Sequence, residues 1–94
     1  MHKEFVVVSY DVPDDRRRQK LAQVLLDHGS RVQYSVFECL LTAKQWEGLR
    51  KRIEKIVDKE QDRVRFYHLC EACVGRIELL GEGKIEEDVT VYII

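Results

Sequence analysis

An apolar run near the start of the chain, which ends on a carboxylate just before a proline, constrains the fold more than any other feature. The run is rich in β-branched residues, so it predicts a strand over residues 4–10 with Asp11 at its carboxyl end. Pro13 presets a turn, and Asp14 and Asp15 suit the cap and first turn of a helix, where carboxylates bind free amides. The sequence predicts a strand, a tight corner and a helix in this order.

A cluster of cations follows this corner, at the start of a helix that we expect over residues 14–28. The cluster and one cation beyond the helix are Arg16, Arg17, Arg18, Lys20 and Arg31. Guanidinium groups bind phosphate through two parallel hydrogen bonds, which makes these residues candidate phosphate clamps. The alternative is a solvated helix face whose cations pair with nearby aspartates. The spacing alone leaves both interpretations open.

The composition predicts one folded domain over residues 1–94. Of the 94 residues, 45% are hydrophobic and 35% are charged, and only one is proline, which argues against disorder. The net charge of −1 gives no overall attraction for nucleic acid, so phosphate binding needs a local cluster of cations. No apolar run approaches membrane-spanning length and no secretory core follows the charged start, so we expect a cytoplasmic protein.

Two apolar stripes predict two amphipathic helices. The first stripe is Leu21, Val24, Leu25 and His28, with Gly29 placed to end the helix. The second helix begins with a capping box of Thr42 and Gln45, in which each side chain satisfies a free backbone amide. Its buried stripe is Trp46, Leu49, Ile53, Ile56 and Val57.

The remaining segments have the composition of strands. Residues 31–41 lack Gly, Pro, Asn and Asp, and their pattern favours one long, bent strand. Residues 63–69 predict another strand, and residues 74–80 and 89–94 two more, with residues 70–73 as a link. This order fits two helices on one face of an open sheet. The uncovered face and the unpaired terminal strand, about residues 88–94, favour a homodimer in which the open faces meet and that strand is shared.

Asp11 is the leading candidate for chemistry, because ligands commonly bind at the carboxyl ends of strands in folds of helices and sheets. The alternative is a turn or cap residue, a common place for aspartate. In a dimer whose twofold axis passes near this strand end, two Asp11 carboxylates would repel each other, and Mg²⁺ would relieve the repulsion with few protein ligands. Water on such an ion has a lowered pKa and can attack phosphorus.

The three cysteines, Cys39, Cys70 and Cys73, are an odd set that favours reduced thiols over a disulfide framework. Cys70 and Cys73 have the spacing of half a zinc site, but the second pair is missing, which disfavours zinc. A reduced turn that joins two strands is the favoured interpretation. Thioredoxin-like redox chemistry is disfavoured, because the motif is not expected to open a helix after a first strand.

Three motifs in order resemble the CRISPR-associated endoribonuclease family, the small dimeric partner of the CRISPR integrase. They are the strand that ends on Tyr10 and Asp11, the arginine-rich helix start, and residues 29–38, and the resemblance extends over nearly the whole chain. It implies an α+β fold, a ferredoxin-like βαββαβ sandwich with an additional C-terminal strand that joins the partner's sheet, and a homodimer through the sheets. It also implies that residues 31–41 break into two short strands near Tyr34 and Ser35.

The resemblance assigns roles to single residues. The family's metal-binding aspartate falls on Asp11, one from each subunit, with Mg²⁺ between them. Its helix arginines fall on Arg18 and on Lys20. Lysine at position 20 keeps the positive charge but lacks the paired donors of a guanidinium group. The catalytic set that we expect is Asp11, Arg18, Arg31 and Phe37. The nucleic-acid-binding set is Tyr10, Arg16, Arg17, Lys20 and Ser35.

The resemblance implies two different functions. One is Mg²⁺-dependent cleavage of single-stranded RNA or double-stranded DNA in CRISPR spacer acquisition. The other is a non-catalytic role, in which the dimer clamps duplex DNA while the integrase subunit inserts new spacers. A ferredoxin-like regulatory domain that binds a small ligand is a third possibility, disfavoured by the arginines. Nucleic acid would be held through its phosphates, without regard to base sequence.

Overall fold

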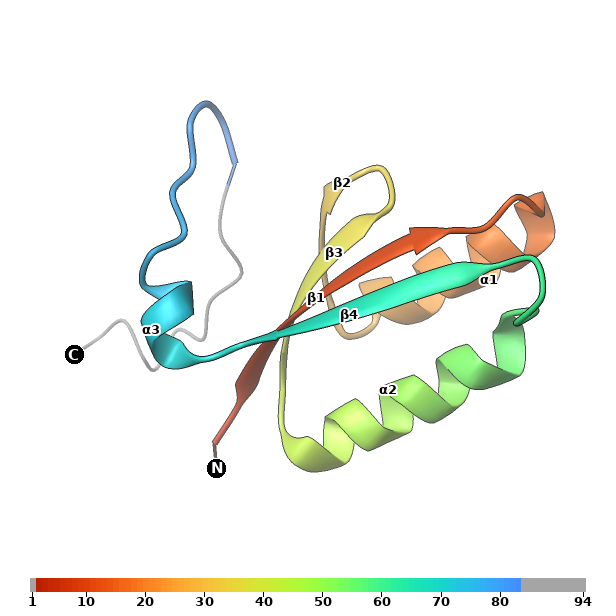
Figure 1. Cartoon of the computed structure of the whole chain (residues 1–94), viewed down its shortest axis with the longest axis horizontal. Coiled ribbons are helices and arrows are strands. Elements are labelled where there is room, and N and C mark those ends of the chain that lie inside the picture. The colour runs from red at the N-terminus through yellow and green to blue at the C-terminus, as the bar shows by residue number, and fades with distance from the viewer. Residues whose placement is uncertain (1, 84–94) are drawn as a thin grey trace.

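Four strands and three helices lie along residues 2–83, the part of the chain that the computed structural model describes (Figure 1). The elements in chain order are β1 (Glu4–Asp11), α1 (Asp15–Leu26), β2 (Gly29–Gln33), β3 (Val36–Leu41), α2 (Ala43–Ile56), β4 (Arg63–Leu69) and the short α3 (Glu71–Val74).

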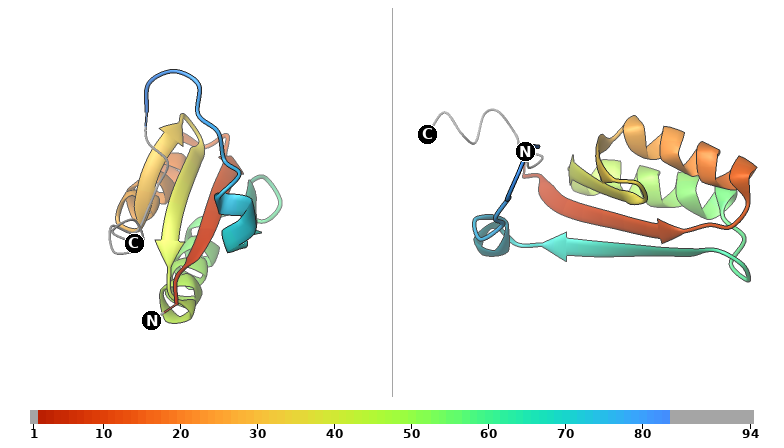
Figure 2. Two further views of the ribbon diagram at one scale, coloured as in Figure 1. Left: turned by 90° about the vertical axis from the view of Figure 1, so that its left-hand side faces the viewer. Right: turned by 90° about the horizontal axis from the view of Figure 1, so that it is seen from above.

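The strands form one antiparallel sheet of four, in the order β2-β3-β1-β4. β1 is central, and its residue Val6 lies opposite Cys39 of β3 and His68 of β4. Both long helices lie on the same side of the sheet (Figure 2). The order and the layers confirm the α+β, ferredoxin-like expectation. The expected terminal strand, about residues 88–94, lies outside the described residues.

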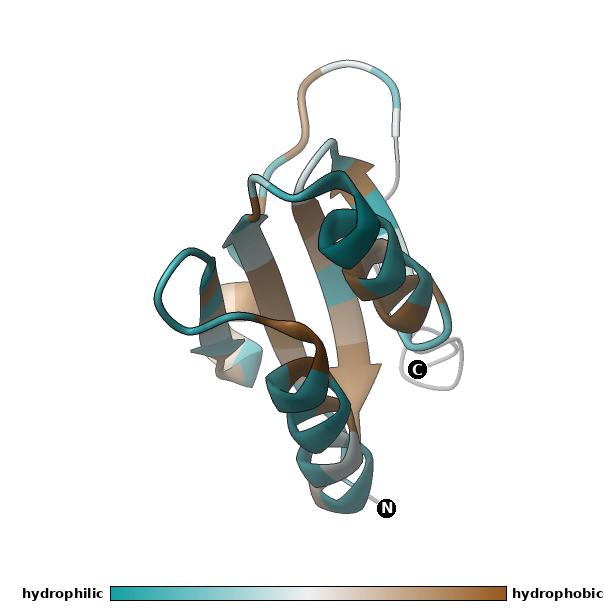
Figure 3. Cartoon of the chain, turned by 90° about the vertical axis from the view of Figure 1, so that its right-hand side faces the viewer, coloured by the Kyte–Doolittle hydropathy of each residue, from teal (hydrophilic) through white to brown (hydrophobic). Residues whose placement is uncertain are grey.

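The core fills the space between the sheet and the two helices. Figure 3 shows the apolar strands behind helices whose outward surfaces are hydrophilic. The strands contribute Val6, Val8, Tyr10, Phe37, Cys39 and Leu41, and the helices contribute Leu21, Ala22, Val24, Leu25, Leu49 and Ile53. Trp46, Ile56 and Val57 pack against this cluster, so the stripe predicted for the second helix is confirmed. Within residues 2–83 no helix is long and apolar enough to cross a bilayer.

The predicted helix starts are confirmed, and the end of α1 is not. The Asp14 carboxylate accepts a hydrogen bond from the backbone N–H of Arg17 at 2.8 Å, and Thr42 and Gln45 form the capping box. α1 ends at Leu26, and Gly29 begins β2 instead of ending the helix. A Cβ on Gly29 would lie 2.3 Å from the Glu38 carbonyl oxygen, so glycine is needed here for close approach of β2 to β3.

The single bent strand expected over residues 31–41 is wrong. The chain turns at Tyr34 and Ser35 and forms the β2–β3 hairpin, as the family resemblance implied. The turn is fixed from outside the segment, because the backbone N–H of Tyr10 donates a 3.0 Å hydrogen bond to the Ser35 carbonyl. A composition rich in β-formers therefore did not reveal the break.

The strand expected over residues 74–80 is also wrong, and so is the turn that would have joined it to residues 63–69. Cys70 is the N-cap of α3, and the backbone N–H of Val74 donates to the Cys70 carbonyl at 3.0 Å. The backbone N–H of Gly75 bonds the Glu71 carbonyl in the same way. These amides are satisfied within a helical turn, so they do not extend the sheet.

Candidate functional site

Asp11 is the last residue of β1 and lies on the face of the sheet turned away from α1 and α2. Side chains alternate along a strand, and Val6, Val8 and Tyr10 face the core, so Val7, Ser9 and Asp11 face the other way. We call this side the open face. By the strand register it also carries Val36, Glu38 and Leu40 of β3 and Arg63, Arg65, Tyr67 and Leu69 of β4. Asp11 is exposed, and its carboxylate forms no hydrogen bond or ion pair with the rest of residues 2–83.

Arg63 is a residue that the sequence did not single out. It is the first residue of β4 and pairs directly with Asp11 in the antiparallel register. Paired residues have Cβ atoms about 5 Å apart on one face, so a guanidinium lies within reach of whatever the Asp11 carboxylate binds. Only the register of β4 against β1 could have identified it, since the two residues are far apart in the sequence.

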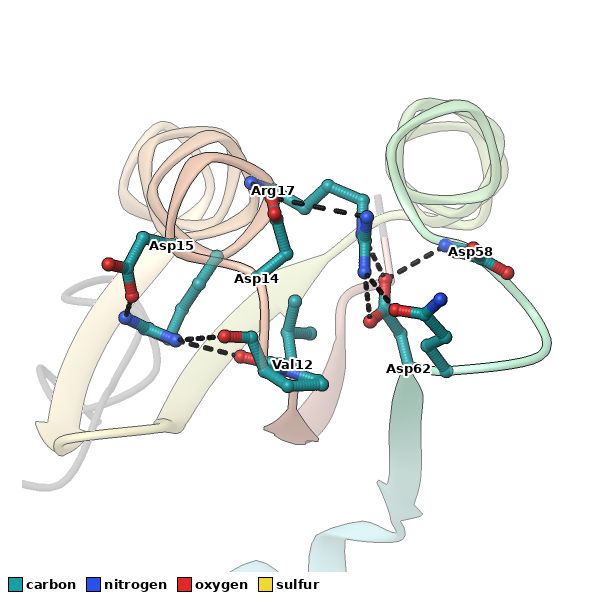
Figure 4. Close-up of polar contacts among 9 residues, drawn as sticks. Val12, Asp14, Asp15, Arg17, Asp58 and Asp62 are labelled. Atoms are coloured by element: carbon teal, nitrogen blue, oxygen red, sulfur yellow. Dashed lines mark hydrogen bonds and ion pairs between the residues drawn. The ribbon is translucent and has the colours of Figure 1, made fainter.

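Arg17 forms a structural brace with Asp62, in the turn before β4 (Figure 4). Its Nε donates to one carboxylate oxygen at 2.8 Å and its second nitrogen donates to the other at 3.0 Å. Asp62 exposes none of its side chain (0%) and also accepts from the backbone N–H of Asp58 at 2.8 Å. The hydrogen bond with Arg17 lowers the pKa of Asp62 and raises that of Arg17. The guanidinium donors of Arg17 are therefore used in contacts within the protein.

Arg18 holds the corner between β1 and α1. One nitrogen donates to the Val12 carbonyl at 2.8 Å, and the other pairs with the Asp15 carboxylate (Figure 4). A carbonyl just after β1 and a carboxylate in the first turn of α1 are thus joined through one side chain. In this arrangement Arg18 fixes the backbone that carries Asp11.

The aromatic residues that the resemblance placed in the site are buried. Tyr10 is 5% exposed and Phe37 is 0% exposed, and their rings stack with centroids 6.2 Å apart. The guanidinium of Arg31 lies over the Phe37 ring, 5.2 Å from its centroid, in a cation–π contact. Arg31 is the exposed member of this stack, and the buried rings of Tyr10 and Phe37 form the surface on which its guanidinium packs.

Arg16 and Lys20 differ from the two arginines between them. Both are exposed, and neither forms a hydrogen bond or ion pair with another residue in the described range 2–83. Ser35 is half-buried, with its carbonyl bonded to Tyr10. Of the predicted cations, Arg16, Lys20 and Arg31 keep their charges toward solvent, while Arg17 and Arg18 bond to the protein itself.

The donors present suit a hard cation with few protein ligands. No group of three or more histidine, cysteine, aspartate or glutamate side chains gathers within residues 2–83 to form a complete metal site. Mg²⁺ is commonly bound by one or two carboxylates with water as the remaining ligands. The uncommitted Asp11 carboxylate fits this requirement as one of the one or two carboxylates that such an ion needs.

Comparisons with known proteins agree on one family. The sequence model described as CRISPR associated protein Cas2 matches residues 4–77. A protein of Synechocystis named CRISPR-associated endoribonuclease Cas2 3 is 47% identical over 79 residues, 84% of this chain and 86% of the relative.

Solved structures give the same result. The crystal structure of Streptococcus pyogenes Cas2 is 36% identical with a TM-score of 0.72, over 82% of this chain and 99% of that one. A chain of a partial Cas6-RT-Cas1–Cas2 complex is 30% identical with a TM-score of 0.71, over 82% of this chain and 90% of that one.

Proposed function

This chain belongs to the Cas2 family of CRISPR-associated proteins, and we propose that it is a metal-dependent nuclease that hydrolyses phosphodiester bonds in CRISPR spacer acquisition. Relatives that are 47% and 45% identical carry the names endoribonuclease and endonuclease. The observation that carries the proposal is the exposed Asp11 carboxylate, opposite Arg63 and without a partner among the described residues.

The proposal includes a homodimer through the open faces. This face carries apolar side chains that the helices do not cover, and Tyr67 leaves 47% of its surface exposed. A second copy would bury these side chains, since large apolar surfaces are rarely left in water. An axis near the end of β1 would bring the two Asp11 carboxylates together, and Mg²⁺ between them would offset their repulsion.

Each residue of the site has a separate task in the proposed reaction. Bound Mg²⁺ would supply Lewis-acid activation of water. The Asp11 carboxylates provide its oxygen ligands, and Arg18 keeps Asp11 in place by holding the corner beside it. Arg63 offers positive charge to the phosphate beside Asp11, and Arg31, Arg16 and Lys20, on the helix side of the sheet, hold the flanking backbone. Contacts between these cations and phosphates carry no information on base sequence, so both RNA and duplex DNA are candidate substrates.

The second candidate function is a non-catalytic scaffold that holds duplex DNA for the integrase. One observation favours it, the similarity to a chain in a structure titled as a Cas1–Cas2 complex. Exposed Arg16 and Lys20 serve either function, because duplex binding also needs cations that are free to meet phosphates.

Asp11→Asn separates the two functions. The substitution keeps the shape of the side chain and removes the charge that Mg²⁺ needs, so cleavage should fall by about 100-fold or more, beyond the effect of losing a secondary contact to a metal site. Cleavage of single-stranded RNA and of duplex DNA is measured in Mg²⁺ and in EDTA, and duplex binding is measured in parallel. Full cleavage by the variant would refute the catalytic role. Absence of cleavage by the unchanged protein on every substrate, with tight duplex binding, would favour the scaffold.

A further inference from the structure

Cys70 and Cys73 lie at the far end of β4 from Asp11, where the chain leaves the sheet (Figure 1). β4 separates the two places by about 20 Å, at 3.4 Å for each of its residues. Both thiols are free and exposed, in contrast to the buried thiol of Cys39. Neither the candidate site nor the proposed nuclease activity uses them.

The helical turn of α3 brings the two cysteines together. Cys70 is the N-cap and Cys73 is the third residue of the helix, with the 3.0 Å hydrogen bond from Val74 to the Cys70 carbonyl closing the turn. Side chains three positions apart in a helical turn lie on one side, with Cβ atoms about 5–6 Å apart. The two thiols are within hydrogen-bonding reach of each other, and a disulfide needs Cβ atoms about 4 Å apart, so closing it requires a small shift of the turn's backbone as well as rotation of the side chains.

The surroundings make the two thiols unequal. The backbone N–H of Cys73, and then its thiol, stabilise the Cys70 thiolate and lower the pKa of Cys70. The interaction with Cys70 raises the pKa of Cys73. Since the thiolate is the nucleophile, Cys70 is the residue that attacks first and Cys73 the one that reacts second.

We propose that Cys70 and Cys73 form a thiol–disulfide exchange site for low-molecular-weight disulfides such as oxidised glutathione. The Cys70 thiolate attacks one sulfur of the small disulfide, which gives a mixed disulfide and releases one thiolate. Cys73 loses its proton to solvent and attacks the Cys70 sulfur, which closes the Cys70–Cys73 disulfide and releases the second thiolate. The protein gives up two protons and two electrons, and the small disulfide becomes two thiols.

Two observations favour exchange over metal binding. The two exposed thiols lie three positions apart in one helical turn, which the sequence did not predict, and a lowered pKa at the first cysteine of a Cys-x-x-Cys pair is typical of thiol–disulfide exchange. Zinc in a structural site takes four ligands, and no third histidine, cysteine, aspartate or glutamate joins these thiols within residues 2–83.

To test the proposal, the whole protein is incubated with oxidised glutathione at neutral pH, and the reaction is monitored by intact-mass spectrometry. We expect the mass of the unchanged protein to fall by two hydrogen atoms, without a lasting adduct. Cys73→Ser should accumulate one glutathione on Cys70, because the resolving thiol is missing. Cys70→Ser should react at least about 10-fold more slowly, since Cys73 is the poorer nucleophile. Cys39→Ser is the matched control and should behave as the unchanged protein does.

The proposal would be overturned by a stable double adduct on the unchanged protein, by no reaction at all, or by faster reaction at Cys73 than at Cys70. Stoichiometric zinc binding that protects both thiols from glutathione would also overturn it. Nuclease activity and duplex binding of both variants are measured as well and should be unchanged. These measurements can therefore refute the exchange site without refuting the proposed nuclease activity, and can refute the nuclease activity without refuting the exchange site.

Discussion

Asp11 and Asp62 lie at the same end of the sheet and differ in what their carboxylates contact. Asp62 is buried and bonded on both oxygens, to Arg17 and to the Asp58 amide. Asp11 is exposed and opposite Arg63, with no bond to another described side chain. A carboxylate whose partners are all internal stabilises the fold, and one left without partners is available for a ligand.

The cations of α1 show the same division within two turns of helix. Arg17 and Arg18 bond to Asp62 and to the β1–α1 corner, whereas Arg16 and Lys20 point to solvent. A run of basic residues is therefore not one phosphate clamp. Part of the run assembles the corner, and the rest remains free to meet a polyanion.

The largest expected effect comes from exchanging the two aspartates for asparagine in separate variants. Asp11→Asn should lose cleavage by about 100-fold or more with an unchanged melting temperature. Asp62→Asn should lower the melting temperature by about 5–10 °C, because it removes the charge from a buried pair, and should keep its activity at temperatures where it is folded. Calorimetry and a cleavage assay on both proteins are sufficient. A stability loss in Asp11→Asn would remove the distinction between the two carboxylates.

Arg63→Gln should reduce cleavage by about 10-fold, since a residue beside a metal ligand supports the reaction without holding the metal. Arg65→Gln is the control, because Arg65 is on the same face of β4 and pairs with Ser9 instead of Asp11. Single-turnover rates at saturating Mg²⁺ are the measurement. Equal losses in the two variants would mean that general charge, and not the register with Asp11, is responsible.

Arg17→Met should change how stability depends on pH. The pKa of Asp62 is lowered in the folded protein, so its ionised form adds stability that is complete above the ordinary carboxyl pKa and is lost as the pH falls through the lower folded value. The unchanged protein should lose stability over this acidic range more steeply than Arg17→Met does. Melting temperatures measured from neutral to acidic pH give both slopes, and parallel curves would contradict the assignment.

The smallest effect is expected from Arg16→Gln and Lys20→Gln. Each removes one free cation, so duplex binding should weaken modestly, and the slope of log affinity against log salt should fall by about 1 for each substitution. Lys44→Gln, at the start of α2 near the opposite end of the sheet, is the control and should leave the slope unchanged. Slopes equal to that of the unchanged protein would exclude α1 from the binding surface.

Short-range features of this fold were predictable and long-range ones were not. The caps at Asp14 and Thr42 join residues three positions apart, so the sequence displays both partners. The Arg17–Asp62 bond spans 45 positions, and nothing near either residue indicates it. Likewise, the turn at Ser35 depends on Tyr10, and the pairing of Arg63 with Asp11 depends on the register of β4. The sequence identified Asp11 as a candidate, but its freedom from internal partners had to come from the structure.

The most direct test of a site shared by two Asp11 carboxylates is a mixing experiment. Unchanged protein and Asp11→Asn are mixed in equal amounts, exchanged through mild denaturant and refolded, and cleavage is compared with that of the unchanged protein at the same total concentration. If each site needs both carboxylates, random pairing leaves about a quarter of the activity. Retention of about half, which independent sites in each chain would give, or of about three quarters, which a dimer needing only one Asp11 would give, would contradict a site that needs both carboxylates.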